Sequence, residues 1–87
     1  MHTVVWTDEA EKDLENILAY YLKEAGPAVA QSVFARLSEQ VGSLRRFPER
    51  CRPGRVPGTR EYVVARLPYI AVVAVTDSQV FVLAVVH

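Results

Sequence analysis

The chain has 87 residues, of which 51% are apolar, and this length allows one domain, residues 1–87, without room for a second core. Ten basic side chains balance ten acidic ones, which excludes the polycation typical of proteins that coat nucleic acid without sequence preference. Cys51 is the only cysteine, so no internal disulfide can form, and with His2 and His87 it gives no zinc-ligand spacing. We therefore expect a cytoplasmic protein without a metal or a cofactor.

No segment has the composition of a membrane span or of a signal peptide. The longest apolar runs, Tyr69–Val75 and Val80–Val86, are far shorter than the roughly 20 residues that a bilayer requires. The N-terminus leads directly into acidic residues, whereas a signal peptide needs a basic start and a longer apolar stretch. No contact with a membrane is expected.

The first part of the chain is expected to form a strand followed by a helix. Thr3–Trp6 is β-branched and aromatic, and Thr7 is a residue type that caps helices through its hydroxyl group. From Asp8 to about Glu24, apolar side chains recur at helical spacing, with acidic side chains in the first turn.

A second helix is predicted immediately after the first. Gly26-Pro27 provides a break and a proline suited to a first helical position. An apolar stripe then runs from Ala30 to Leu44 and ends before Pro48, which a helix cannot continue through. Two amphipathic helices joined by so few residues predict an antiparallel helical hairpin.

The C-terminal half is expected to form a loop and then a meander of three strands. Residues 45–58 combine arginine with proline and glycine, which is typical of a loop. Three β-rich runs follow, Glu61–Ala65, Tyr69–Val75 and Gln79–Val86, with connections short enough for hairpins. The fold class is therefore α+β: an N-terminal strand and a helical hairpin packed on a four-stranded, mainly antiparallel sheet.

The last two strands indicate that both faces of this sheet need cover. Residues 69–75 and 80–86 are apolar throughout instead of alternating with polar residues. The helical hairpin can cover one face, and we expect another polypeptide to shield the other. The alternative is a small curved sheet whose second face is closed by the loop 45–58. Without its partner the chain is expected to aggregate or to form a homodimer.

The charges are unevenly distributed along the chain. Residues 1–44 carry seven acids and three bases, whereas residues 45–66 carry seven arginines and two glutamates. A guanidinium group fits phosphate or carboxylate with two hydrogen bonds, which favours a recognition surface. The alternative is that these arginines only pair with acids of the first helix. The arginines expected to bind a target are Arg46, Arg52, Arg55, Arg60 and Arg66.

One set of side chains has the chemistry of a ribonuclease. Arg60 and Glu61 open the first strand of the meander, and we expect them to meet His87, which closes the last strand, at one end of the sheet. Such a set suits phosphodiester cleavage, in which one group removes a proton, the arginine stabilises the phosphate and the histidine protonates the leaving oxygen. The alternative is that Glu61 pairs with a nearby arginine and His87 has no role.

Several motifs resemble those of one known family over essentially the whole chain. They are Val5-Trp6-Thr7-Asp8-Glu9-Ala10, Gly54-Arg55-Val56-Pro57-Gly58-Thr59-Arg60-Glu61, Leu67-Pro68-Tyr69 and the final Val82-Leu83-Ala84-Val85-Val86-His87. Together with the order of elements, they resemble the RelE/ParE toxin superfamily of bacterial type II toxin–antitoxin modules, and the second and third motifs are typical of its ParE-like side.

The resemblance implies a small α+β toxin that a cognate antitoxin holds inactive with an arm that folds over it. In such modules the toxin reaches operator DNA only indirectly, through the antitoxin. An apolar arm agrees with the uncovered face inferred above, because an arm that folds on binding needs a large apolar contact. The residues expected to bind it are Leu18, Tyr21, Phe34, Tyr62 and Tyr69.

The resemblance leaves two targets. ParE-like members act on DNA gyrase without being enzymes, whereas RelE-like members cut messenger RNA on the ribosome, without a metal. Cleaving members place a basic residue near the start of the penultimate strand, and here Leu67-Pro68-Tyr69-Ile70 has none. We therefore favour gyrase. Members commonly continue past the final histidine with a short tail, whereas this sequence stops at His87. A weakened or non-toxic member that retains only antitoxin binding is therefore the second alternative.

Overall fold

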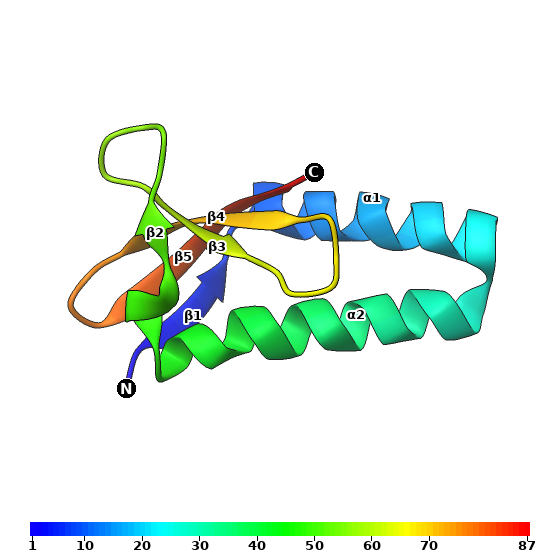
Figure 1. Cartoon of the computed structure of the whole chain (residues 1–87), viewed down its shortest axis with the longest axis horizontal. Helices are drawn as coiled ribbons and strands as arrows, with labels where there is room; N and C mark the ends of the chain where they lie inside the picture. The colour runs from blue at the N-terminus through cyan, green and yellow to red at the C-terminus, as the bar shows by residue number, and fades with distance from the viewer.

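The computed structural model describes all 87 residues as a helical hairpin packed on one curved sheet (Figure 1). The strands are β1 (Thr3–Trp6), β2 (Arg52–Pro53), β3 (Arg60–Val63), β4 (Ile70–Val75) and β5 (Gln79–Val86). The helices are α1 (Asp8–Ala25) and α2 (Pro27–Gly42), and two 3-10 turns follow them, η1 (Ser43–Arg45) and η2 (Pro48–Arg50). Neither α1 nor α2 is long and apolar enough to cross a membrane.

The helical hairpin forms where the sequence predicts it. The Thr7 hydroxyl oxygen accepts a hydrogen bond from the Ala10 amide at 3.2 Å and so caps α1. Gly26 ends α1 with a φ of 90°, a conformation that a residue with a side chain rarely adopts, and Pro27 starts α2. The two helices extend beyond the sheet on one side of the molecule (Figure 1).

The sheet has the strand order β1-β5-β4-β3-β2, in which only β1 and β5 run parallel. This confirms the α+β fold class and the mainly antiparallel sheet, with one strand more than predicted. The additional strand is β2, inside the segment expected to be a loop, where Arg52 pairs with Glu61 and Pro53 with Arg60. A two-residue strand next to proline and glycine has no hydrophobic periodicity, so the pattern could not indicate it.

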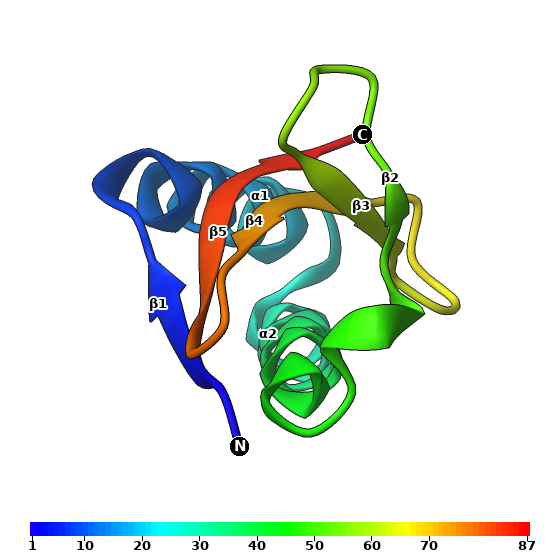
Figure 2. The same cartoon turned by 90° about the vertical axis from the view of Figure 1, so that its left-hand side faces the viewer.

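The core lies between the helices and one face of the sheet. Leu37 and Val41 of α2 and Leu44 of η1 are fully buried in one core cluster with Val73 and Val82 of the central strands. The opposite face, here called the outer face, has no helix over it in Figure 2. On it, Val63 remains 52% and Val86 43% exposed. The chain therefore covers one face only, and the loop expected as an alternative cover reaches only the border of the outer face.

The edge of β5 changes partner halfway along the strand. Beyond the end of β1, the Thr7 hydroxyl donates to the Val82 carbonyl oxygen at 2.8 Å, and the Val85 amide donates to the Asp13 carboxylate at 2.9 Å. The pairing of β5 with β4 shifts at this point, and Leu83 has no partner in the register, which is the pattern of a β-bulge. Helix α1 thus takes the place that a longer β1 would occupy and fixes the last residues of β5.

Candidate functional site

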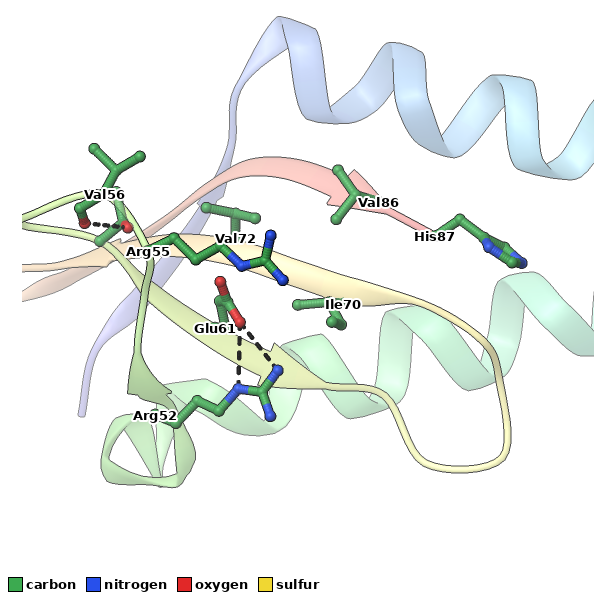
Figure 3. A pocket seen from close by; sticks show the side chains of 9 residues that line it. Arg52, Arg55, Val56, Glu61, Ile70, Val72, Val86 and His87 are labelled. Atoms are coloured by element: carbon green, nitrogen blue, oxygen red, sulfur yellow. Dashed lines mark hydrogen bonds and ion pairs between the residues drawn. The ribbon is translucent and has the colours of Figure 1, made fainter.

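A concavity of about 350 Å³ lies on the outer face, and we call it the arginine pocket (Figure 3). Its floor consists of apolar side chains from β4 and β5, and its polar border comes from β2, β3, the loop between them and His87. Its lining residues are Arg52, Arg55, Val56, Thr59, Glu61, Ile70, Val72, Val86 and His87. The pocket therefore combines an apolar floor with guanidinium groups, as a surface that recognises carboxylate or phosphate would.

Glu61 is held by Arg52 across the β2–β3 pair. The Arg52 Nε and Nη2 atoms donate to Glu61 Oε1 at 3.2 and 3.0 Å. The Glu61 side chain is only 15% exposed, whereas the Arg52 side chain is 58% exposed. This is the single ion pair of the protein, so the Arg55 guanidinium has no carboxylate partner and is available to a ligand.

The loop that carries Arg55 is closed by its own hydrogen bonds. The Gly54 amide donates to the Thr59 carbonyl oxygen at 2.9 Å, and the Thr59 hydroxyl donates to the Val56 carbonyl oxygen at 2.6 Å. A Cβ atom on Gly54 would lie 2.9 Å from the backbone of Thr59, so only glycine allows this approach. The loop therefore presents Arg55 to the pocket from a defined position.

The structure does not bring the three candidate catalytic residues together. Glu61 and His87 line the arginine pocket, but Arg60 lies on the opposite face of the sheet, because successive residues of a strand point to opposite sides. There it lies near Cys51, whose thiol pKa is raised by burial and lowered to a lesser extent by the Arg60 charge.

The expectation that these residues meet at one end of the sheet is also wrong. Two antiparallel steps restore the chain direction, so β3 and β5 run the same way and the start of one lies far from the end of the other. Glu61 pairs with Val72, which pairs with Ala84. His87 comes three residues after Ala84, about 10 Å further along the strand.

A second concavity, of about 550 Å³, lies between α1 and the end of the β3–β4 hairpin, and we call it the aromatic groove. Tyr20 and Tyr21 meet edge to face with ring centroids 5.3 Å apart, and Tyr69 meets His87 in the same way at 5.7 Å. The remaining lining residues are Asn16, Ile17 and Pro68. Burial, with a smaller contribution from the neighbouring Tyr21, raises the pKa of Tyr69 to about 12, so the Tyr69 hydroxyl keeps its proton at neutral pH.

The residues expected to bind an antitoxin fall into three places. Tyr21 and Tyr69 line the aromatic groove. Leu18 and Phe34 line another groove, of about 370 Å³, between α1 and α2. Tyr62 is half-buried against the core, and its hydroxyl donates to the Gln40 Oε1 atom at 3.4 Å. The first four thus frame two grooves on either side of α1, whereas Tyr62 belongs to the packing between β3 and α2.

The arginines expected to bind a target are also divided. Only Arg52 and Arg55 line the arginine pocket. Arg60 is on the other face, Arg46 follows η1, and Arg66 lies in the turn at the far end of the β3–β4 hairpin. In Figure 1 that turn points toward the helices, away from the loop before β3.

Two features of the structure leave no signal in the sequence. Arg50 stacks over the exposed ring of Phe47, with its Cζ atom 4.3 Å from the ring centroid. Gln40 binds the β3–β4 turn from α2. Neither Arg50 nor Gln40 belongs to a motif, and nothing in the sequence distinguishes a glutamine on a helix from an ordinary surface residue. No group of three His, Cys, Asp or Glu side chains is placed to hold a metal ion.

The comparison with protein families identifies the class of protein that this fold belongs to. Residues 4–87 match the model of the family described as the ParE toxin of the type II toxin–antitoxin system parDE. The chain therefore belongs to the ParE toxin family. It is also 43% identical over 65 residues to the protein named "Putative toxin Y4kP" of Sinorhizobium fredii (strain NBRC 101917 / NGR234), a match that covers 75% of this chain and 67% of that protein.

Solved structures support the same assignment. The chain is similar to a chain of the chromosomal ParDE toxin–antitoxin system from P. aeruginosa, with a TM-score of 0.90, 30% identity, and coverage of 98% of this chain and 94% of that one. A chain of the toxin–antitoxin complex RelBE2 from Mycobacterium tuberculosis is less similar, with a TM-score of 0.67, 26% identity, and coverage of 99% and 96%.

Proposed function

We propose that this toxin inhibits growth by binding DNA gyrase and that it cuts no RNA. The observation that carries the proposal is the arrangement around Glu61. Its carboxylate oxygen already accepts two hydrogen bonds from Arg52, and Arg60 faces the other side of the sheet. A ribonuclease needs a free base and cations fixed around one phosphate, whereas a binding surface needs only complementary shape and charge.

The arginine pocket is the part of the surface that we propose for target binding. The unpaired Arg55 guanidinium offers two hydrogen bonds to a carboxylate of the target, and Ile70, Val72 and Val86 offer an apolar floor to the neighbouring side chain. Arg and apolar anchors in a concave site are typical of the centre of protein interfaces. Gyrase and the ribosome are both cytoplasmic, so either target places the toxin in the cytoplasm.

Neutralisation by an antitoxin is the second part of the proposal. The aromatic groove and the groove lined by Leu18 and Phe34 flank α1, and both are mainly apolar. An apolar arm of the antitoxin that lies along α1 would fill both, as expected for a segment that folds on binding. The assembly of the similar ParDE and RelBE2 chains with antitoxins supports such a partner.

RNA cleavage remains the second candidate function because one observation favours it. Arg52, Arg55 and Glu61 line one pocket, and His87 lines the same pocket at the end of β5, although its ring packs against Tyr69 of the aromatic groove. The similarity to a RelBE2 chain agrees with this candidate. The third candidate is a weakened toxin that keeps only antitoxin binding.

Expression of the toxin without its antitoxin tests these candidates. We expect filamentation and DNA-damage signalling with intact messenger RNA, together with loss of supercoiling by purified gyrase. Arg55→Gln should abolish both effects, whereas Lys12→Gln, on the exposed surface of α1, should preserve them. Rapid transcript loss that depends on Glu61 and His87 would favour the ribonuclease, and normal growth would favour the weakened toxin.

A further inference from the structure

The β3–β4 turn contains the one strained residue of the chain. Arg66 has a φ of 67° and is the only residue other than glycine with a positive φ. An L-residue with a long side chain is disfavoured there, and glycine or asparagine usually occupies such a turn position. Strained residues of this kind cluster at binding and active sites, where the strain serves the function.

The surrounding structure holds this turn in place. The Val64 amide donates to the Tyr69 carbonyl oxygen at 3.1 Å and closes the turn. The Gln40 side chain of α2 binds Ala65 twice, accepting from its amide at 2.7 Å and donating to its carbonyl oxygen at 3.0 Å. The amide group of Gln40 thus pairs with Ala65 as a neighbouring strand would. The conformation of Arg66 is therefore imposed by fixed neighbours on both sides.

The Arg66 guanidinium has no partner within the chain. Arg66 is exposed and takes part in no ion pair. The binding surface next to it is the aromatic groove, because Pro68 and Tyr69 of the same turn line that groove. The loop that borders the arginine pocket lies at the other end of β3. Arg66 itself lines neither concavity, but along the chain it lies two residues before Pro68 of the aromatic groove and at the opposite end of β3 from the loop of the arginine pocket.

We infer that Arg66 is a specificity contact for the antitoxin and pairs with a carboxylate of the arm that lies in the aromatic groove. This inference rests on the proposed neutralisation. A guanidinium near a mainly apolar groove complements an arm in which an acidic residue follows or precedes the apolar anchors. Such a pair favours the cognate arm over arms that lack the acid, since their binding would leave the charge unmatched.

The variant Arg66→Asn tests the inference, with the full toxin titrated by the product of the adjoining reading frame. Asparagine tolerates the left-handed conformation, so the thermal midpoint should not fall and should rise by up to about 4 °C. Affinity for the antitoxin should fall at least tenfold, as expected for a lost charge-assisted pair. Growth inhibition in cells without antitoxin should persist.

Two controls make the result specific. Ala65→Gly, in the same turn but at negative φ, should lower the thermal midpoint and leave the affinity unchanged. Replacing each acid of the antitoxin arm by its amide should reveal one position whose effect disappears in the Arg66→Asn background.

Each remaining outcome contradicts the inference. A lower thermal midpoint of Arg66→Asn would show that the arginine itself stabilises the turn. Unchanged affinity would show that it does not contact the antitoxin. Loss of growth inhibition with unchanged affinity would assign Arg66 to the target surface. If the wild-type chain does not bind the product either, the proposed neutralisation fails as well, so the two failures are distinguishable.

Discussion

The arginine pocket and the aromatic groove differ in how the chain builds them. Apart from His87, the polar border of the pocket comes from one short stretch, residues 52–61, placed over an apolar floor. The groove joins α1, the β3–β4 turn and His87, and Tyr69 in its wall also belongs to the core. A site built from a surface loop can change without loss of the fold, whereas a site that shares a side chain with the core cannot.

The largest effect is expected from Tyr69→Ala. Tyr69 is only 8% exposed, and truncation of a buried aromatic residue costs about 3–5 kcal/mol. Denaturant unfolding should show this loss together with weaker antitoxin binding. Tyr20→Ala is the matched control, since Tyr20 lines the same groove but is 58% exposed, and its cost should be within about 0.5 kcal/mol. Equal costs would contradict the distinction between groove and core.

Asp13→Ala should affect the arginine pocket and the aromatic groove together, so it should not separate the two sites. The Asp13 carboxylate holds the Val85 amide at 2.9 Å, just before Val86 of the pocket and His87 of both sites. Loss of a hydrogen bond to a charged group costs about 1.5–3 kcal/mol. Amide exchange at Val85 should accelerate. Asp13→Asn keeps an acceptor and should lose less; if it loses as much as alanine, the bond is not the cause.

A smaller effect on stability is expected when the ion pair of the pocket is removed. Arg52 is largely exposed, and a pair of this kind contributes about 0–1 kcal/mol. Arg52→Gln and Glu61→Gln should therefore unfold within about 1 kcal/mol of the wild type, while target inhibition changes. Thermal unfolding and a gyrase supercoiling assay measure the two effects separately. A large loss of stability would show that the pocket, too, supports the fold.

The ionisation of Tyr69 should lower the stability of the fold only above about pH 10. Its pKa is raised to about 12 from an ordinary value near 10, so the folded state keeps a proton that the unfolded state loses. Stability should therefore decline as pH rises from about 10 to 12 and should be insensitive to this group below that range. Unfolding of the wild type and of Tyr69→Phe across this range tests the sign, because the variant should decline less.

Much of the fold could be predicted because periodicity determines it. The apolar stripes gave the two helices, and Thr7 and Gly26 mark their ends as expected. The strand β5 has its predicted bounds. The strand β3, by contrast, ends at Val63 instead of Ala65, because Gln40 draws the Ala65 backbone toward α2. A side chain that replaces a strand as the hydrogen-bonding partner leaves no periodic signal.

The candidate site was less predictable because its residues come together through the sheet. The sequence placed Arg60 beside Glu61, but strand alternation sends them to opposite faces, and the register keeps Glu61 away from the end of β5. The pairing of Glu61 with an arginine, considered as an alternative, is the one observed. The pairing of β2 with β3 determines that this arginine is Arg52. The sequence could not indicate it, because a two-residue strand has no periodic pattern of its own.

The replacement of β1 by α1 along β5 also determines where another chain can add a strand. Free strand edges are the usual starting points of edge-to-edge aggregation. The longest and most apolar strand, β5, has no free edge, because β1, Thr7 and Asp13 occupy one side and β4 the other. The open edges are short: the four-residue β1, the two-residue β2, the part of β3 beyond β2 and the last two residues of β4 beyond β3. Fibril growth would have to begin from these short edges, so the toxin is protected against cross-β assembly through its longest strand, β5.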